Sequence, residues 1–331
     1  ALQLMREACL QEGSVCRKSQ RAWMLLGDLT ESLAEDDEVE DVKKVYEGMM
    51  DLRIATPQIV LNFAAILEEK RYFEEAFRVY EKGVGLFRYP HSFPIWKAYL
   101  GKFVARYKGK KVERTRELFH QAIDSVAARL AEERGGKTRT GKKAEKEKAA
   151  ADGADASAGL ADLYVQYAGF EESHGLAKNV MSIFDAAVRA ADAKDRAALY
   201  NKYLKKASEF YGVAKVRAVY QQCIEEEAGE GAGLEDEDAK QMCLRYAQLE
   251  KKLGEIDRAR AILRHGAQMA NPKQDRAYWA DWNAFEVAHG NEDTFREMLR
   301  IKRSVAAFYS EANQSMLGAM AATAAAAGSG A

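Results

Sequence analysis

Proline is scarce in this sequence: it occurs four times in 331 residues, at Pro57, Pro90, Pro94 and Pro272. Proline inside a helix costs about 3 kcal/mol, so its rarity leaves most of the chain free to be helical. The sequence also lacks the sustained alternation of β-branched residues that indicates strands. We therefore expect an all-helical chain with every proline between helix pairs and none inside a helix. Thr56 and Pro57 are expected to be the N-cap and the first residue of one helix.

Cysteine and histidine are also few, with four and five residues. The cysteines Cys9, Cys16, Cys223 and Cys243 are not spaced like metal ligands, and the chain contains no His-Glu-x-x-His motif. No serine stands in a nucleophile-elbow motif. These absences argue against an enzyme and predict no metal and no cofactor. Unpaired cysteines favour a reducing compartment, the cytosol or the nucleus.

The chain also has almost no net charge and no long apolar run. Lysine and arginine number 50 against 51 aspartates and glutamates, so the formal net charge is −1. A balance of this kind creates no general field that attracts nucleic acid or an anionic membrane. No apolar run approaches the roughly 20 residues of a membrane-spanning helix. We expect no membrane partner.

Bulky side chains that recur every 36 residues are what the sequence does contain. This spacing separates Phe63 from Tyr99, Tyr167 from Tyr203, and Tyr246 from Trp282. A period of that size is typical of helical repeat arrays, in which each unit buries its apolar face against its neighbours. Such arrays offer long surfaces to partner proteins and rarely carry catalytic chemistry.

Each repeat is predicted to be a pair of helices. The first helix carries bulky anchors three residues apart, which places them on one face, and the second helix ends on a bulky residue. Seven such pairs are expected, so the predicted fold is an all-α solenoid wound as a right-handed superhelix. The aromatic residues that define the repeats are Trp23, Phe63, Trp96, Tyr99, Tyr167, Tyr203, Tyr220, Tyr246, Trp279 and Trp282.

Glycine marks the turn inside four of the pairs, at Gly175, Gly212, Gly254 and Gly290. A glycine just past a helix end tolerates the left-handed backbone conformation that closes the last turn. We expect that conformation at these positions.

Charged residues form two columns in the repeat. Glu171, Glu250 and Glu286 each follow an aromatic anchor by four residues, and Arg116, Arg217, Arg260 and Arg296 each precede the bulky end of a second helix by three. A catalytic row of acids and bases is one interpretation. Recurrence favours a structural one, because a catalytic site is made once whereas a packing device is repeated. Each glutamate is therefore expected to meet an arginine or a backbone amide inside its repeat.

Composition divides the chain into three parts. Residues 1–17 are predicted to be the leftover second helix of an earlier pair, as in a fragment of a longer protein. Residues 18–311 are the repeat array, and residues 312–331 are an Ala/Gly-rich tail. Two segments interrupt the array: a basic low-complexity insertion at 129–159 and a loop at 225–238 with eight acidic residues and no basic one. Both are expected to lie outside the packed core.

Basic residues also gather in the last predicted helix, at Arg296, Arg300, Lys302 and Arg303. They are candidate contacts with RNA or with an acidic partner. The alternative is that they form the polar outer face that the end of a repeat array needs.

The repeat pattern resembles the half-a-TPR (HAT) repeat, because it combines Trp-x-x-Tyr/Trp and a glutamate in the first helix with Arg-x-x-aromatic in the second. Three longer strings are similar to pre-mRNA-splicing factors of the Syf-one, or XPA-binding protein two, type. They are residues 51–60 (DLRIATPQIV), 252–260 (KLGEIDRAR), and 289–305, which begins HGNEDT and ends RSV. The similarity covers nearly all of the chain except the insertion, the acidic loop and the tail, and it corresponds to the C-terminal half of such proteins.

This resemblance implies a nuclear, non-catalytic scaffold in the spliceosome, within the NineTeen complex and the intron-binding module. The partners it implies are a crooked-neck-like HAT protein, an Aquarius-type helicase and small helical splicing factors, with RNA contact secondary. Two alternatives stay open: a HAT protein that binds RNA directly, and a scaffold linked to transcription-coupled DNA repair.

Overall fold

The structure is a computed structural model that describes residues 2–10, 14–33, 39–135, 143–224 and 233–328. Side chains are described over 3–9, 14, 16–32, 40–132, 156–224 and 233–311. All regular elements in these ranges are helical. Parts of the two expected interruptions, at 136–142 and 225–232, lie outside the described residues.

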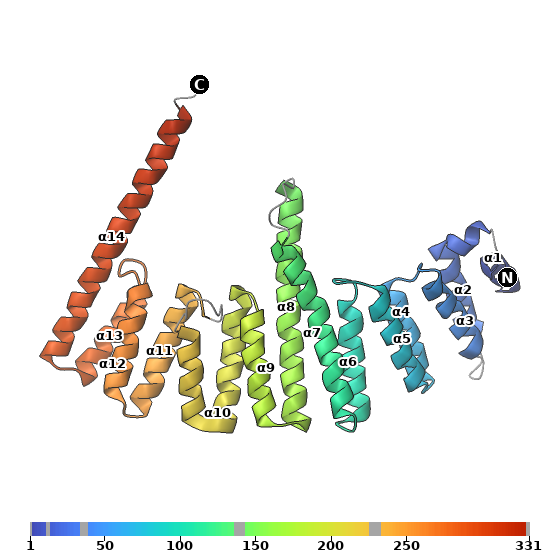
Figure 1. The fold of residues 1–331 in the computed structure, drawn as a ribbon, viewed down its shortest axis with the longest axis horizontal. Coiled ribbons are helices and arrows are strands. Elements are labelled where there is room, and N and C mark those ends of the chain that lie inside the picture. Colours follow the sequence, from blue (N-terminus) through green and yellow to red (C-terminus); the bar gives the residue numbers. More distant parts are fainter. Residues whose placement is uncertain (1, 11–13, 34–38, 136–142, 225–232, 329–331) are drawn as a thin grey trace. The chain divides into compact units, whose positions relative to one another are not determined.

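Contacts between helices divide the chain into two compact units, Ala1–Ile183 and Phe184–Ala331. The first unit contains a short 3-10 helix, η1 (Val15–Lys18), and the following α-helices (Figure 1): α1 (Leu2–Leu10), α2 (Gln20–Leu33), α3 (Val39–Asp51), α4 (Pro57–Glu69), α5 (Phe73–Leu86), α6 (Phe93–Tyr107), α7 (Val112–Gly135), α8 (Lys143–His174) and the first half of α9 (Ala177–Ala190).

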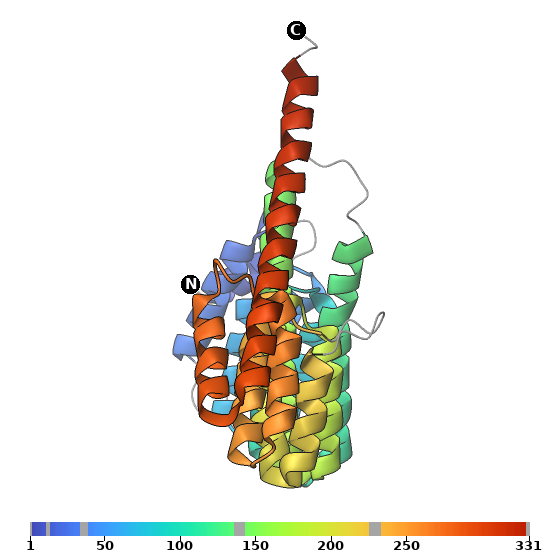
Figure 2. The same ribbon diagram turned by 90° about the vertical axis from the view of Figure 1, so that its left-hand side faces the viewer.

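The second unit begins within α9 and continues with α10 (Ala193–Ile224), α11 (Asp236–Lys252), α12 (Ile256–Gly266), η3 (Ala267–Met269), α13 (Arg276–His289) and α14 (Glu292–Gly328). The helix α10 is two helices joined at Gly212, where φ is 68° and ψ is −157°. Figure 2 shows α14 extending well past the ends of α11, α12 and α13.

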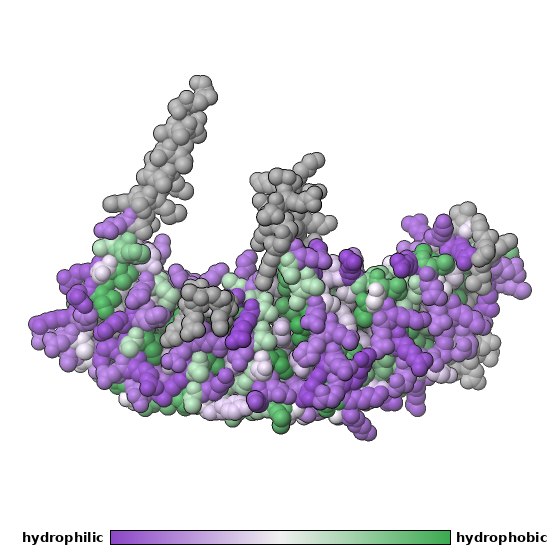
Figure 3. Space-filling view, in the orientation of Figure 1, coloured by the Kyte–Doolittle hydropathy of each residue, from purple (hydrophilic) through white to green (hydrophobic). Residues whose placement is uncertain are grey.

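These helices form the seven expected pairs. They are α2 with α3, α4 with α5, α6 with α7, α8 with α9, the two halves of α10, α11 with α12, and α13 with α14. The prediction of an all-α solenoid is confirmed, and the right-handed superhelix remains a prediction. Figure 3 shows hydrophilic residues over most of the visible surface, because the apolar faces of the helices are turned toward one another.

Prolines lie where the helix geometry tolerates them. Thr56 is the N-cap of α4, as expected, and its hydroxyl accepts a hydrogen bond from the Ile59 backbone N–H at 3.4 Å, with Pro57 as the first helical residue. Pro94 is the second residue of α6 and therefore lies inside a helix, contrary to our expectation. A first-turn N–H has no partner within the helix, so proline loses nothing there.

Helices extend into the segment 129–159. The end of α7 and the beginning of α8 both fall within it, and Leu130 and Ala156, near its two ends, are buried. At the acidic loop, the backbone N–H of Leu234 donates to the Cys223 carbonyl at 3.2 Å, and Arg196 donates to the Gly233 carbonyl at 2.5 Å, so the base of that loop is closed. The boundaries of the insertion, the loop and the tail remain predictions.

Candidate functional site

Stacked aromatic rings lie at five of the six junctions between successive helix pairs. The ring of Tyr220, near the end of α10, lies parallel to that of Tyr246 in α11, with centroids 4.7 Å apart and an interplanar angle of 3°. The same stack, with centroids 4.9–5.5 Å apart, joins Tyr46 to Phe63, Tyr80 to Tyr99, Phe119 to Tyr167 and Phe184 to Tyr203. The period therefore has a physical meaning: at these junctions a first-helix anchor packs on the bulky residue of the preceding second helix. Contrary to our expectation, that bulky residue does not end its helix, since α3 continues past Tyr46 to Asp51 and α7 continues past Phe119 to Gly135.

The tryptophan anchors are buried, as expected for residues that build the core. Trp23, Trp96, Trp279 and Trp282 are between 1% and 5% exposed. The indole N–H of Trp23 donates to the Arg17 carbonyl at 2.9 Å, and that of Trp279 donates to the Ala270 carbonyl at 3.1 Å. These bonds satisfy the one polar atom of each buried ring.

The glutamate and arginine columns meet as three buried ion pairs. Arg116 in α7 holds both carboxylate oxygens of Glu171 in α8, at 2.6 and 2.9 Å. Arg217 holds Glu250 at 2.8 and 2.7 Å, and Arg260 holds Glu286 at 3.0 and 3.1 Å. The glutamate side chains are fully buried in all three pairs.

The position of these ion pairs corrects the expectation that they form inside a repeat. Each arginine lies on the second helix of one pair, and its glutamate lies on the first helix of the next pair. The columns therefore fasten neighbouring repeats together. A sequence period alone cannot distinguish the two arrangements, because both repeat every 36 residues.

Burial and hydrogen bonding act in opposite directions on the Glu171 carboxylate. Burial of Glu171 disfavours its charged form, but hydrogen bonds from Arg116 and Asn179 outweigh this effect, so the pKa of Glu171 is lowered from its ordinary value. The hydrogen bond to Glu171 likewise raises the pKa of Arg116. Both groups therefore stay charged near neutral pH.

Apolar side chains occupy one or both of these positions at two other interfaces. Phe77 in α5 and Phe103 in α6 stand where the arginine and the glutamate stand elsewhere, and their ring centroids are 5.2 Å apart. Between α3 and α4 the corresponding residues are Lys43 and Leu67, and Leu67 is 1% exposed. This variation between interfaces was not predicted, although an alignment of the repeats residue by residue reveals it in the sequence.

The turn glycines divide into two kinds. Gly212 and Gly254 have the expected left-handed conformation, with φ of 68° and 83°. Gly290 does not, since its φ is −96°. A Cβ atom there would lie 2.4 Å from a carboxylate oxygen of Glu286, and one at Gly175 would lie 1.9 Å from Glu171. These two glycines make room for the buried carboxylate, which corrects the reason given for them from sequence.

Basic residues of α14 have neighbours of different kinds. Arg296 bonds to Glu292 at 2.5 Å and Arg300 to Glu297 at 2.8 and 2.9 Å, all within the helix. The Lys302 ammonium lies 5.7 Å from the centre of the Trp279 ring, and Arg303 is exposed. A role of these residues in binding RNA or a partner remains a prediction.

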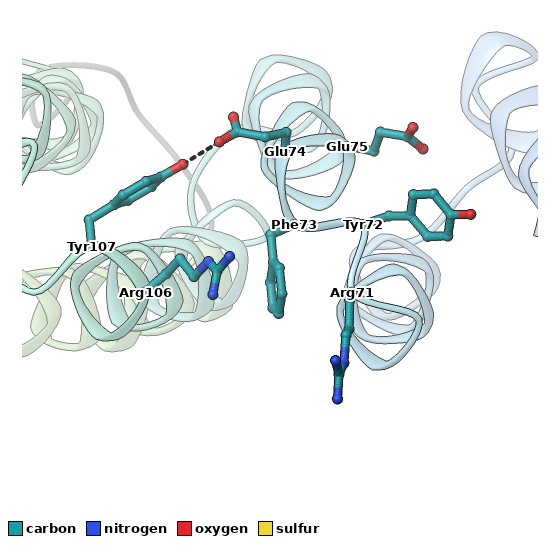
Figure 4. Close-up of a pocket in the computed structure, with 7 residues that line it drawn as sticks. All are labelled: Arg71, Tyr72, Phe73, Glu74, Glu75, Arg106 and Tyr107. Atoms are coloured by element: carbon teal, nitrogen blue, oxygen red, sulfur yellow. Dashed lines mark hydrogen bonds between the residues drawn. The ribbon is translucent and has the colours of Figure 1, made fainter.

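A pocket of about 310 Å³ lies beside the turn between α4 and α5. Figure 4 shows its lining, in which the Tyr107 hydroxyl donates to Glu74 at 2.5 Å and the Arg106 guanidinium stands 4.1 Å from the centre of the Phe73 ring. Arg71, at the turn, has a φ of 68° and points away from the glutamates. The side chains that line the pocket do not converge on one point, so the pocket lacks the arrangement of a catalytic centre. The sequence pattern had not singled out these residues.

The described residues lack both a metal-binding cluster and a membrane-spanning helix. They contain no group of three or more His, Cys, Asp or Glu residues that could hold a metal ion. None of their helices is both long enough and apolar enough to cross a membrane.

Several known proteins with similar sequences are named pre-mRNA-splicing factor SYF1. Splicing factor SYF1 of Rattus norvegicus and of Homo sapiens is 44% identical to this chain over 292 residues, which is 88% of this chain and 30% of each relative. SYF1 of Dictyostelium discoideum is 42% identical over 299 residues, 90% of this chain and 31% of the relative. The chain thus spans less than a third of the length of these relatives.

One solved structure, a circular tandem repeat protein, aligns over 92% of this chain and 62% of its own, but with 11% identity and a TM-score of 0.29 it carries no argument. Residues 5–134 and 139–330 match the family described as the pre-mRNA-splicing factor Syf1/CRNKL1 C-terminal HAT repeat. This match covers nearly the whole chain, so the chain with its helix pairs, stacked rings and ion pairs belongs to the Syf1/CRNKL1 C-terminal HAT-repeat family.

Proposed function

We propose that this chain is a non-catalytic protein-binding scaffold for pre-mRNA splicing in the nucleus. Family membership supports the link to splicing, because the curated relatives are named as splicing factors. The repeat architecture supports the scaffold role, because stacked helix pairs present an extended surface on a rigid frame.

The observation that carries this proposal is that the buried acidic side chains form ion pairs between neighbouring helix pairs. Among the described residues, the carboxylates that are buried are Glu171, Glu250 and Glu286. All three are held by arginines at the interfaces between helix pairs. Catalytic acids need a solvent-accessible or substrate-accessible cleft with a tuned pKa. These acids fasten the frame instead, so the function rests with the outer surface.

The finer proposal places the chain in the NineTeen complex and the intron-binding module. Its proposed partners are a crooked-neck-like HAT protein, an Aquarius-type helicase and small helical splicing factors. These partners follow from the family resemblance, and RNA contact is secondary to them. A repair-linked role in transcription-coupled DNA repair is the less favoured alternative, because no structural feature described above points to damaged DNA.

Replacement of the matching segment in a relative tests the splicing proposal. In mouse cells depleted of their own SYF1, a chimera carrying this chain in place of the aligned 292 residues should restore splicing and co-purify with spliceosomal RNAs. Intron retention, measured by RNA sequencing, is the readout. A chimera with Trp282→Ala should fail, because loss of a core tryptophan costs about 3–5 kcal/mol. A matched surface variant, Arg258→Met, should be as active as the unaltered chimera. A stable, folded chimera that neither joins spliceosomal RNAs nor lowers intron retention would contradict the proposal.

Salt dependence separates the scaffold from a direct RNA binder. Contacts with phosphates make affinity fall steeply as salt rises, by about 0.7 log units per log unit of salt for each single-strand phosphate neutralised. The isolated chain should bind single-stranded RNA weakly at physiological salt. Tight binding there, with a steep salt dependence that weakens when basic residues of α14 are removed, would favour the RNA-binding alternative.

A further inference from the structure

The outward face of α14 carries arginines around one leucine. Arg296, Leu299, Arg300 and Arg303 recur at spacings of three and four and so share one side of the helix. The opposite side packs inward: Met298 is 2% exposed, and Ile301 and Val305 lie against the core cluster of the second unit. Leu299 lies at the border of the two sides, because it is only partly buried and also packs against that cluster. The outward side is open, with 68% of the Arg296 side chain and 76% of the Arg300 side chain exposed.

This face repeats, one unit later, the face of α12 that receives α13. A shift of 36 residues converts Arg260 to Arg296, Leu263 to Leu299 and Ala267 to Arg303. On α12, Arg260 is bonded to Glu286 of α13, and the side chain of Arg260 is only 14% exposed. Leu263 is 3% exposed and belongs to the same core cluster as Trp282 of α13. The first position thus holds a glutamate from the neighbouring helix, and the second packs with an aromatic ring.

Arg296 also has an acidic neighbour on its own helix, as Arg116 and Arg260 do. Arg260 is bonded to Asp257, three residues earlier, at 2.7 Å, and Arg116 is bonded to Glu113 at 2.7 Å. Both of these arginines bond to a glutamate of the next helix at the same time. Arg296 lies 3.9 Å from Asp293, again three residues earlier. An acid on the same helix is therefore compatible with, and accompanies, a second acid from a neighbour.

We infer that the outward face of α14 is a docking surface for an acidic, aromatic helix of a partner protein. The partner helix carries a glutamate that bonds to Arg296 and, four residues before it, an aromatic residue that packs on Leu299. The order follows from Trp282 and Glu286 of α13, which are four residues apart.

The direction of the partner helix follows from the α12–α13 pair. Arg260 meets Glu286 late in α13, whereas Leu263 accepts a hydrogen bond from Tyr278, early in α13, at 2.6 Å, so the two helices are antiparallel. In that arrangement the residue opposite Arg303 lies about seven positions before the glutamate. Because Arg303 replaces a small alanine, the partner needs a second acid at that position.

RNA is the competing occupant of a surface with three arginines. Two observations favour the helix. Leu299 lies between the arginines and is only partly buried against its own unit; its remaining exposed surface would gain nothing from a phosphate backbone but gains burial under an aromatic ring. The surface also repeats an arginine and a leucine, Arg260 and Leu263, of a face that a helix covers within this same chain. The inference does not depend on the splicing proposal, because it concerns the chemistry of one helix face.

A synthetic helix can test the surface directly. The probe is a fluorescently labelled peptide with the sequence of residues 275–290 in which Trp279→Glu supplies the second acid. Binding to the full 331-residue chain is followed by fluorescence anisotropy. Removing the glutamate that corresponds to Glu286 (E286Q in the peptide), or the arginine (Arg296→Met in the chain), should weaken binding about tenfold or more. A charge-assisted hydrogen bond of this kind has that effect on an affinity.

Matched controls identify the site. Arg258→Met removes an exposed arginine from α12 and should leave the affinity unchanged. Arg296→Glu in the chain should abolish binding, and a peptide with arginine in place of its glutamate should restore it. Circular dichroism should show that the variants are folded, since the Arg296 side chain is mostly exposed.

Three results would overturn the inference. One is equal binding of the peptide by the unaltered chain and by Arg296→Met. The second is an absence of peptide binding together with tight, strongly salt-dependent binding of single-stranded RNA that Arg296→Met weakens. The third is self-association of the chain that Arg296→Met disrupts in sedimentation experiments, since a second copy would then occupy the face.

Discussion

The ion pair between Arg260 and Glu286 should be costly to break and cheap to replace. Glu286 is 2% exposed and accepts hydrogen bonds from Arg260 at 3.0 and 3.1 Å and from the Trp282 indole at 3.1 Å. In an Arg260→Met variant a buried carboxylate loses its only cationic partner within reach among the described residues. Stranding a buried charge in this way costs about 3–5 kcal/mol.

A double variant, Arg260→Met with Glu286→Leu, should be more stable than Arg260→Met alone. It removes the stranded charge, and apolar residues already stand at the same positions at other interfaces, as Phe77 with Phe103 and Leu67 do. The indole N–H of Trp282 then lacks its acceptor, which costs about 1–3 kcal/mol. We therefore expect the double variant to resemble Glu286→Leu, with the two substitutions strongly non-additive.

Hydrogen exchange combined with urea unfolding can measure this cycle. Repeat arrays depart from two-state unfolding, so the amides of α11, α12 and α13 should be followed individually. Arg258→Met, an exposed arginine on α12, is the matched control and should change stability by no more than about 0.5 kcal/mol. Additive losses, with the double variant less stable than either single variant, would show that Arg260 and Glu286 do not act as a pair.

Three other predictions concern single residues. Gly290→Ala should destabilise the second unit, because the new Cβ would lie 2.4 Å from the Glu286 carboxylate and 2.6 Å from the Glu286 backbone oxygen. Gly85→Ala is the control: a Cβ there has no atom within 4 Å, so this variant should stabilise α5 by up to about 1 kcal/mol in thermal unfolding, and equal effects of the two variants would refute the steric reason. Tyr246→Ala should cost about 3–5 kcal/mol, with faster hydrogen exchange confined to α10, α11 and α12, and uniform loosening of the whole chain would contradict nearest-neighbour coupling. The lowered pKa of Glu171 contributes stability that is complete above its unfolded pKa of about 4.5 and is lost as pH falls through the lower folded value. The melting temperature should therefore fall more steeply from pH 5 to pH 3 in the unaltered chain than in Glu171→Gln. Parallel melting curves of the two proteins would argue against this linkage.

Local patterns were sufficient to predict the helix pairs. Anchors such as Tyr167 and Tyr246 stand three residues from other bulky groups, and this spacing is a direct consequence of helix geometry. Thr56 before Pro57 identified a helix start for the same reason, since capping depends on a few adjacent residues. Burial of these anchors followed once the pairs were known.

Relations between helices were harder to predict. The sequence has the same period whether Glu171 meets an arginine in its own pair or in the preceding one, and only the packing of α7 on α8 decides. Gly175 and Gly290 were assigned to left-handed turns because glycine is common there, but their cause is the proximity of a buried carboxylate. The separation of four residues between each of these glycines and its glutamate is visible in the sequence, but the burial of the carboxylate against the glycine is not.

The difference between ionic and apolar interfaces restricts the order in which the repeats can stack. If α7 met α6 of another copy in place of α8, Arg116 would face the apolar Phe103 rather than Glu171, and its charge would be desolvated without compensation. A slip of one unit would likewise set a buried glutamate against the ring of Phe77. Mismatched partners therefore incur an electrostatic penalty that correct partners avoid. The repeats look interchangeable along the sequence, yet an ionic interface and an apolar one cannot exchange neighbours without this penalty, which opposes many misregistered stackings during folding and domain exchange between chains.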